Sequence, residues 1–209
     1  MKEDFSVRAL KERTFNDETY KLVSQAHFSL LHQLQIVEPY IQQHLQQLRE
    51  ENENRSEGWI MKEHNRTFTE WFKNLNLPIG ETRDEQIIHL LTAGPEELVT
   101  TWQAYDINGF TFYTRDKYNK SQNQNSGVSI KAEDSTGHEN TYYGYIDQIW
   151  ELTYGTTLHI PIFKCQWVKH PQGVEVDEYG FTLVSLNNVG HKDEPWILPD
   201  RVAQVFYVL

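Results

Sequence analysis

The sequence predicts an α+β protein, with N-terminal helices in residues 1–97 followed by a compact antiparallel β-barrel or sandwich in residues 98–209. Two observations indicate this class. Apolar residues recur at helical spacing through most of the first stretch. After Pro95 the period changes, and about six or seven short apolar and aromatic runs alternate with Gly, Asn and acidic turns, a pattern typical of small barrels and sandwiches.

The first stretch predicts a series of helices. Residues 23–34 contain no helix breaker, and Pro39 suits the first turn of a second helix, where its missing N–H is not needed. In that helix Ile41, Leu45 and Leu48 fall at i, i+4 and i+7, forming one narrow apolar stripe. Such a stripe must pack either on the rest of this chain or on a partner, and we predict that it is a partner-binding face.

Two further helices follow a polar loop expected at residues 50–57. Residues 59–75 resume helical spacing. Thr82 and Glu85 have the spacing of a capping box, in which each residue satisfies a backbone N–H of the other. This pair predicts a helix over residues 84–91.

The second stretch predicts strands. Asn108-Gly109 lies between apolar runs and predicts a hairpin, because both residues tolerate positive φ. The polar residues 117–127 predict a flexible loop. The other strands are expected at residues 128–132, 142–152, 157–168, 180–186 and 204–208.

The net charge of -11 disfavours a role in binding DNA, since duplex binding depends on Lys and Arg neutralising phosphates. Residues 1–97 and 98–209 carry net charges of -6 and -5, so neither half is basic. This balance suits a basic partner such as a histone, although acidity also serves solubility alone. The possible phosphate contacts are Arg115, Lys117, Lys120 and Lys131.

The residues give little support to catalysis or to a cofactor. Cys165 is the only cysteine and lies in an apolar run, which excludes an internal disulfide and favours a reducing compartment. No His-Glu-x-x-His pair occurs, and no apolar run approaches the roughly 20 residues of a membrane span. Paired carboxylates could bind a divalent cation, but they also suit ordinary turns. These pairs are Asp177-Glu178 and Asp193-Glu194.

Aromatic residues are the most suggestive feature of the second stretch. Converging rings with a nearby acid form a cage for a methylated ammonium group, while core packing is the simpler role for such rings. A loop that brings Trp196 beside Asp193 and Glu194 is the preferred location. The candidate binding residues are Tyr143, Tyr145, Trp150, Tyr179, Asp193, Glu194 and Trp196.

Several long motifs resemble a known family in the same order along the chain. They lie at residues 105–113, 124–128, 143–152, 163–167, 177–183 and 204–208. Together they resemble the uncharacterised C-terminal domain of plant CACTA-type (En/Spm) transposon proteins. Residues 37–41, 63–68 and 71–72 resemble the helical segment that precedes that domain.

The resemblance implies a part of a transposase that lacks the upstream DDE-type nuclease region and has no assigned catalytic residues. We therefore expect a non-enzymatic, intracellular interaction module, nuclear or cytoplasmic, that contacts a transposase subunit or chromatin. An accessory DNA-binding domain and a metal-dependent hydrolase are the alternatives. At the level of fold, the strands at residues 143–152 and 160–168 resemble those of bromo-adjacent homology barrels, which carries no function by itself.

Overall fold

The computed structural model describes residues 17–75, 77, 79–118, 124–133 and 137–208. The chain divides into two compact units. Among the described residues, the helical unit contains residues 17–98 and 152–160, and the β unit contains residues 99–151 and 161–208. The tip between two long strands thus belongs to the helical unit, although its sequence lies in the strand-rich stretch.

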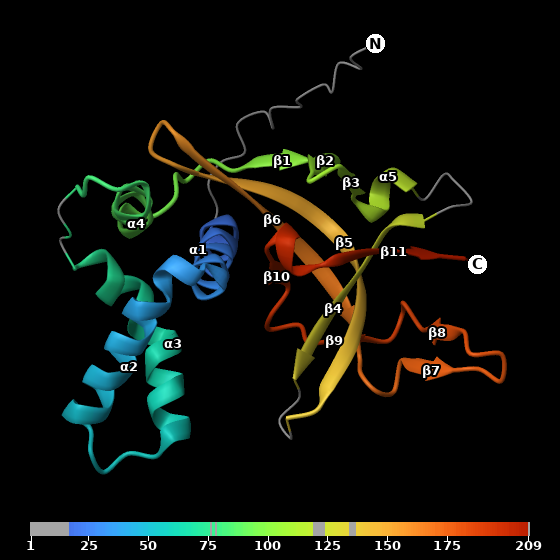
Figure 1. Cartoon of the computed structure of the whole chain (residues 1–209), viewed down its shortest axis with the longest axis horizontal. Coiled ribbons are helices and arrows are strands. Elements are labelled where there is room, and N and C mark those ends of the chain that lie inside the picture. Colours follow the sequence, from blue (N-terminus) through green and yellow to red (C-terminus); the bar gives the residue numbers. More distant parts are fainter. Residues whose placement is uncertain (1–16, 76, 78, 119–123, 134–136, 209) are drawn as a thin grey trace. The chain divides into compact units, whose positions relative to one another are not determined.

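The described part of the helical unit contains four helices of 11 to 17 residues. Figure 1 shows their order along the chain. They are α1 (Asp17–Gln33), α2 (Glu38–Glu51), α3 (Glu57–Lys73) and α4 (Arg83–Ala93), with a 3-10 turn, η1 (Gln35–Val37), before α2. None of the described helices combines the length and apolar character needed to cross a bilayer.

Local sequence signals explain where these helices begin. Pro39 lies in the first turn of α2, and the Ser56 hydroxyl accepts a hydrogen bond from a backbone N–H in the first turn of α3. Thr82 and Glu85 form the predicted capping box at the start of α4. Each device satisfies or removes an N–H that an isolated helix end leaves without a partner.

The apolar stripe of α2 is covered by the chain itself. Ile41, Leu45 and Leu48 are each less than a tenth exposed, and the Tyr40 ring of α2 meets the Phe72 ring of α3 edge to face at 5.5 Å. The stripe therefore lies in the interior of the helical unit. This corrects the expectation of an open partner face, because a short apolar stripe can be buried by the neighbouring helix alone.

Tyr154 anchors residues 152–160 within the helical unit. It is fully buried, and its hydroxyl lies 2.9 Å from Nδ1 of His27 in α1. The adjacent Gly155 has φ 57°, and a Cβ there would lie 3.2 Å from the Leu90 side chain of α4. The turn at residues 154–155 therefore contacts both α1 and α4.

The β unit is built on one seven-stranded antiparallel sheet. Its central path runs β10-β6-β5-β4-β11, with β1 paired to β5 and β9 paired to β6. The strands are β1 (Thr100–Trp102), β4 (Gln124–Glu133), β5 (Glu139–Tyr154), β6 (Leu158–Val168), β9 (Val189–Gly190), β10 (Trp196–Ile197) and β11 (Ala203–Tyr207).

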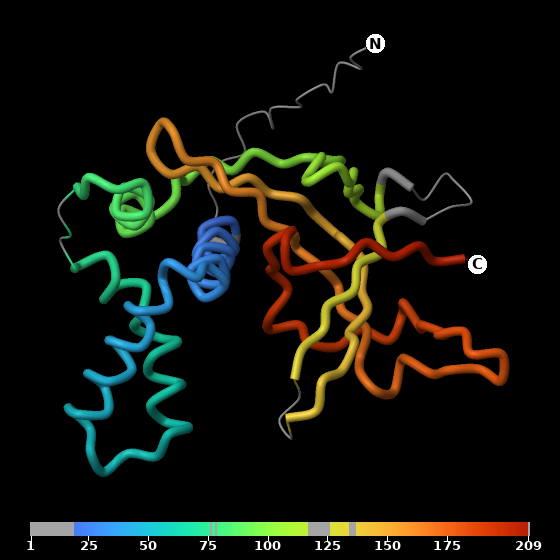
Figure 2. Tube along the Cα trace, viewed as in Figure 1, coloured from blue at the N-terminus to red at the C-terminus, as the bar shows by residue number. Residues whose placement is uncertain are grey.

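Two small hairpins and two short helical turns complete the β unit. One hairpin joins β2 (Ala104–Ile107) and β3 (Phe110–Tyr113), and the other joins β7 (Val174–Val176) and β8 (Thr182–Val184). The helical turns are α5 (Arg115–Tyr118) and η2 (Pro199–Arg201). Figure 2 shows the β7–β8 segment, in orange, leaving the main sheet as a separate arm.

The predicted barrel is wrong, because the sheet is open in the described part of the chain. β10 pairs only with β6 and β11 pairs only with β4, so the sheet keeps two edges. Closure requires the edge strands to pair with one another along their length. β10 has only two residues, which is too short for such a seam.

Another correction concerns the loop predicted at residues 117–127. The chain is already in strand β4 from Gln124 onward, because this segment pairs with β11, Gly127 lying opposite Val205. Polar composition indicated a loop, whereas Gly127 pairs with Val205 on one side and Tyr145 on the other. Ser126 and Gly127 are buried within this strand.

The core of the β unit is one cluster of buried side chains. Its buried members include Ile146, Ile149, Phe163 and Cys165. Burial, with a smaller contribution from Asp147, raises the pKa of the Cys165 thiol well above its usual range. Cys165 is therefore a packing residue and is not activated as a nucleophile.

Candidate functional site

A small pocket forms where β1 lies along β5. In the antiparallel register Thr100 is opposite Glu151 and Trp102 is opposite Ile149. Side chains two residues apart in a strand point to the same face, so Trp102 and Glu151 are diagonal neighbours on one face of the pair. The register thus brings a large ring and a carboxylate together.

Tyr105 closes this corner from β2. Its hydroxyl donates a hydrogen bond to Oε2 of Glu151 at 2.9 Å, and its ring lies 5.8 Å from the Trp102 ring at an interplanar angle of 85°. Burial, followed by the hydrogen bond and charge of Glu151, raises the pKa of Tyr105 to about 12. The phenol is therefore protonated, and it holds the carboxylate in place.

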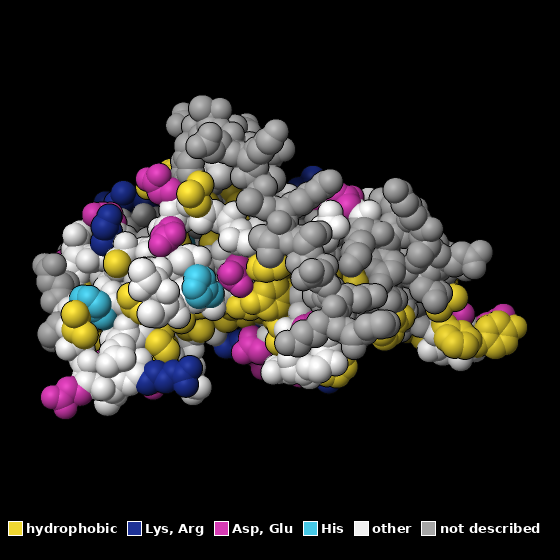
Figure 3. Space-filling model, turned by 90° about the horizontal axis from the view of Figure 1, so that it is seen from above, with side chains coloured by type: hydrophobic (Ala, Val, Ile, Leu, Met, Phe, Trp, Pro, Cys, Tyr) yellow, Lys and Arg dark blue, Asp and Glu magenta, His cyan; other side chains and the backbone are white. Residues whose placement is uncertain are grey.

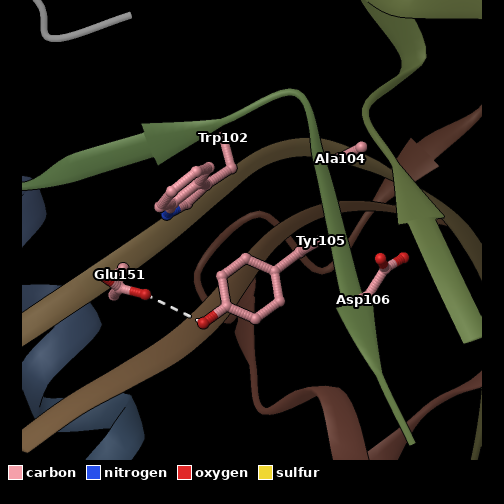
Figure 4. A pocket seen from close by; sticks show the side chains of 5 residues that line it. All are labelled: Trp102, Ala104, Tyr105, Asp106 and Glu151. Atoms are coloured by element: carbon pink, nitrogen blue, oxygen red, sulfur yellow. Dashed lines mark hydrogen bonds between the residues drawn. The ribbon is translucent and has the colours of Figure 1, made fainter. Parts of the chain in front are cut away.

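Figure 4 shows the resulting pocket, which has a volume of about 370 Å³. Tyr105 points toward Glu151, and Trp102 lies above both. Ala104 adds a small apolar wall. Asp106 lines the rim from the other side of β2, where its carboxylate accepts a hydrogen bond from the Thr111 hydroxyl of β3.

The Nε1 atom of Trp102 is buried, and it has no hydrogen-bond partner among the described residues. An unsatisfied buried N–H costs roughly 1–3 kcal/mol. The ring is therefore kept in this position at some cost to stability, and it contributes carbon surface to the pocket.

The second candidate surface is the β7–β8 hairpin. Asp177 builds its turn, since one carboxylate oxygen accepts the backbone N–H groups of Tyr179 and Phe181 at 2.9 Å each, and Gly180 has φ 86°. Figure 3 shows hydrophobic side chains at the right-hand end of the molecule, where this hairpin lies. The exposed apolar residues are Val176 (67%), Tyr179 (77%), Phe181 (67%) and Leu183 (45%).

The sequence-predicted aromatic residues are only partly brought together. Trp150 and Trp196 meet at 4.6 Å between ring centroids, but both are at least nine-tenths buried. Tyr145 is also buried and donates its hydroxyl hydrogen to Gln166. These three rings therefore lie in the interior, the simpler of the two roles considered for them.

The other predicted binding residues are more accessible. Tyr143 is half-buried on β5, whereas Asp193 and Glu194 are exposed. Tyr179 lies on the exposed hairpin. A binding role for these residues stays a prediction.

The predicted phosphate contacts are engaged within the chain or lie outside the described side chains. The Arg115 guanidinium lies 4.2 Å from the centre of the Tyr145 ring, and Lys131 forms an exposed ion pair with Glu139 at 3.2 Å. The side chain of Lys117 and the whole of Lys120 lie outside the described residues.

No three His, Cys, Asp or Glu side chains converge on a possible metal position within the described residues. Of the carboxylate pairs considered for a cation, Asp177 is used in the hairpin turn. The pair Asp193 and Glu194 lies exposed in the loop before β10.

Residues 150–209 match the model of one protein family, described as Domain of unknown function (DUF4216). No curated protein matches the chain, and no solved structure matches it. The matched segment contains β6 to β11 and thus the β7–β8 hairpin. Of the pocket residues it contains only Glu151, because Trp102 and Tyr105 precede it.

Sequence reasoning missed Trp102, Tyr105 and Glu151 as a group. They come from three strands, and the contact between Tyr105 and Glu151 spans 46 residues. The available signal was indirect: Tyr105 precedes the Asn108-Gly109 turn and so lies on a predicted hairpin strand. The pairing of β1 with β5 had no signature in the sequence.

Proposed function

We propose that the chain is a non-catalytic interaction module derived from a CACTA-type transposon protein, and that its β7–β8 hairpin binds a basic partner protein. A transposase subunit and a histone are the partners considered. The motif resemblance supports the transposon origin, as does the match of residues 150–209 to a family known from plant transposase-like proteins.

The observation that carries the proposal is the exposure of the hairpin's apolar side chains. Tyr179 and Phe181 are 77% and 67% exposed at the turn. The strands beside them expose Val176 and Leu183 on opposite faces of the hairpin, because Val176 pairs with Thr182 and Leu183 with Glu175. Grouped exposed apolar residues are typical of protein-binding sites. Rings at such sites become anchors when a partner buries them.

The charge of the hairpin favours a basic partner. It carries Glu175, Asp177 and Glu178, and no Lys or Arg occurs between residues 170 and 191. A second copy of this chain would place like charges opposite one another, which disfavours self-association. A segment that bears Lys or Arg between apolar residues complements both features.

The backbone of the hairpin offers a way to hold such a segment. β7 and β8 form a two-stranded sheet, so each strand has one strand partner among the described residues. The outer edge of such a strand can pair with an extended peptide, whose alternate side chains then contact the exposed rings. This mode requires no catalytic group in the chain.

The test uses the full chain with two partners, recombinant core histones and a transposase catalytic subunit. Replacing both Phe181 and Leu183 by Ser is expected to weaken binding at least roughly tenfold, because both side chains leave the anchoring surface. Phe206→Ser is the matched control, since Phe206 is 65% exposed on β11. Fluorescence anisotropy measures the dissociation constants.

Three results decide between the alternatives. Equal binding by the hairpin variant and the control, or no binding to either partner, contradicts the proposal. Affinity for duplex DNA that falls steeply with salt would instead favour the DNA-binding alternative. Arg115 and Lys131 would then be the residues to replace.

A further inference from the structure

We propose that the pocket formed by Trp102, Tyr105 and Glu151 binds a quaternary ammonium group, such as that of a trimethyllysine side chain or of choline. The pocket lies on β1, β2 and β5, and the hairpin discussed above contributes no residue to it. The inference therefore stands apart from the proposed partner of the hairpin.

The electrostatic character of the pocket selects a cation. The face of an aromatic ring carries a partial negative charge, and two rings, which pack edge to face at 85°, line the pocket. Glu151 adds a full negative charge beside them. Cations bind over Trp and Tyr faces within about 6 Å of the ring centre.

The hydrogen-bonding groups of the pocket select a methylated cation over a primary ammonium. A lysine ammonium has three N–H donors, and each needs an acceptor once water is removed. The acceptors of the pocket lie on its acidic side, where Glu151 also accepts the Tyr105 hydroxyl and Asp106 stands at the rim. Trp102 and Ala104 provide no acceptor atom in their side chains, so an N–H group that faces them stays without a partner. A quaternary ammonium has no N–H group and avoids this penalty.

The arrangement is fixed before any ligand arrives. The phenol of Tyr105 stays protonated at neutral pH, because its pKa is raised to about 12, and it orients the carboxylate of Glu151. Trp102 is half-buried and held in the register of β1 against β5. A preorganised site loses little conformational entropy on binding.

The size of the pocket is also suitable. Ligand pockets commonly have volumes of about 300–1,000 Å³, and this one has about 370 Å³. A trimethylammonium head is a compact group that a pocket of this volume can hold. Asp106 at the rim adds to the negative field around the entrance.

The experiment titrates the full chain with tetramethylammonium, choline and trimethyllysine amide, and follows ring resonances by NMR. Lysine amide and the neutral carbon isostere of choline are the comparison ligands. We expect the three quaternary ions to bind roughly tenfold more tightly than the neutral isostere, since a desolvated cation–π contact favours the cation by about that factor.

Two variants and one control test the assigned residues. Glu151→Gln keeps the acceptor for Tyr105 but removes the charge, and Trp102→Phe keeps a ring but reduces its cation affinity, so both are expected to weaken binding severalfold. Glu139→Gln removes the same charge from an exposed position of the same strand and should leave binding unchanged. Circular dichroism checks that each variant is folded.

The outcomes separate the site from its alternatives. Tighter binding of trimethyllysine amide than of choline identifies a protein side chain as the source, and the reverse identifies a choline compound. Equal affinity for the neutral isostere, or unchanged affinity in Glu151→Gln, overturns the proposal. Failure of all three quaternary ions to bind also overturns it, whatever the hairpin binds.

Discussion

His32 and His64 face each other with their Nε2 atoms 3.0 Å apart, which joins α1 to α3 inside the helical unit. His64 is also linked to α2, because its Nδ1 lies 2.8 Å from Nδ1 of His44. His44 and His64 are almost fully buried, and His32 is half-buried. Three imidazoles thus form one chain of hydrogen bonds across three helices.

Only one arrangement of protons satisfies this chain when the rings are neutral. Nδ1 of His32 faces the Phe28 carbonyl at 2.9 Å and must donate to it, which leaves Nε2 of His32 as an acceptor. His64 then donates from Nε2 and accepts at Nδ1, so His44 donates from Nδ1. The proton positions follow from this bonding pattern.

A first prediction follows for the effect of acid on the helical unit. Burial lowers the pKa of His64 to about 4, with smaller contributions from His32 and His44. Burial also lowers the pKa of His32, opposed by the Phe28 carbonyl and Glu38, and that of His44, opposed by Glu51 and Glu63. Protonating His64 adds a proton at Nδ1, which places two donors opposite each other at its link to His44.

The sign of the effect is fixed by where protons bind. The unfolded histidines titrate near pH 6.5 and the folded ones lower, so the unfolded state binds more protons on acidification. The neutral histidines are therefore expected to make their full contribution to the free energy of unfolding above about pH 6.5. That contribution should fall progressively as the pH is lowered toward about 4. Urea unfolding followed by circular dichroism measures it, and a flat profile across this window would refute the prediction.

The second prediction concerns His27 and Tyr154, which are hydrogen-bonded and buried in the helical unit. Tyr154→Phe leaves a nitrogen of His27 without its partner and should lower the free energy of unfolding by roughly 1–3 kcal/mol. Adding His27→Leu removes that orphaned group. Urea unfolding of both single variants and the double variant should show costs that are less than additive, whereas strict additivity would exclude this coupling.

The third prediction separates a structural role of Arg115 from a DNA-binding role. Its guanidinium lies over the buried Tyr145 ring, so Arg115→Lys should lower stability by roughly 1 kcal/mol, because an ammonium does not stack in the same way. Lys131→Gln is the comparison, since its exposed ion pair with Glu139 contributes only about 0–1 kcal/mol. Thermal unfolding measures both, and loss of duplex affinity without loss of stability would reverse the assignment.

Local features of the fold could be predicted from the sequence because their causes are local. Asn108 and Gly109 have φ values of 51° and 83°, which is the turn that this dipeptide favours. The capping box at Thr82 is formed as expected. The sequence could not show whether the sheet closes into a barrel or stays open, since this depends on pairing between strands that are distant in sequence.

The buried histidines show a signal that sequence reasoning overlooked. His44 falls between Ile41 and Leu48 on the same helical stripe, and His64 lies four residues before Phe68. A polar residue inside an apolar stripe predicts a buried group that requires a partner. The identity of that partner could not be predicted, because the three histidines of this hydrogen-bonded chain lie on three different helices and meet only when these helices pack.

The last prediction tests the close approach of β5 to β6 at Gly144. A Cβ at this position would lie 2.6 Å from the Gln166 carbonyl oxygen and 2.8 Å from the Trp167 ring, so Gly144→Ala must displace backbone and should cost roughly 1–3 kcal/mol. Gly58→Ala is the matched control, because Gly58 lies in the first turn of α3 with open space around it. It should stabilise the chain by about 0.4–1 kcal/mol.

The rate at which a thiol reagent labels Cys165 measures the effect of this pair of variants. It is the only thiol and is 3% exposed in the core of the β unit, so a thiol reagent reaches it only when that core opens. Gly144→Ala should therefore accelerate labelling of Cys165. Unchanged labelling and unchanged stability in Gly144→Ala would mean that the two strands separate to accept a methyl group without loss of packing, contrary to the tight contact at Gln166.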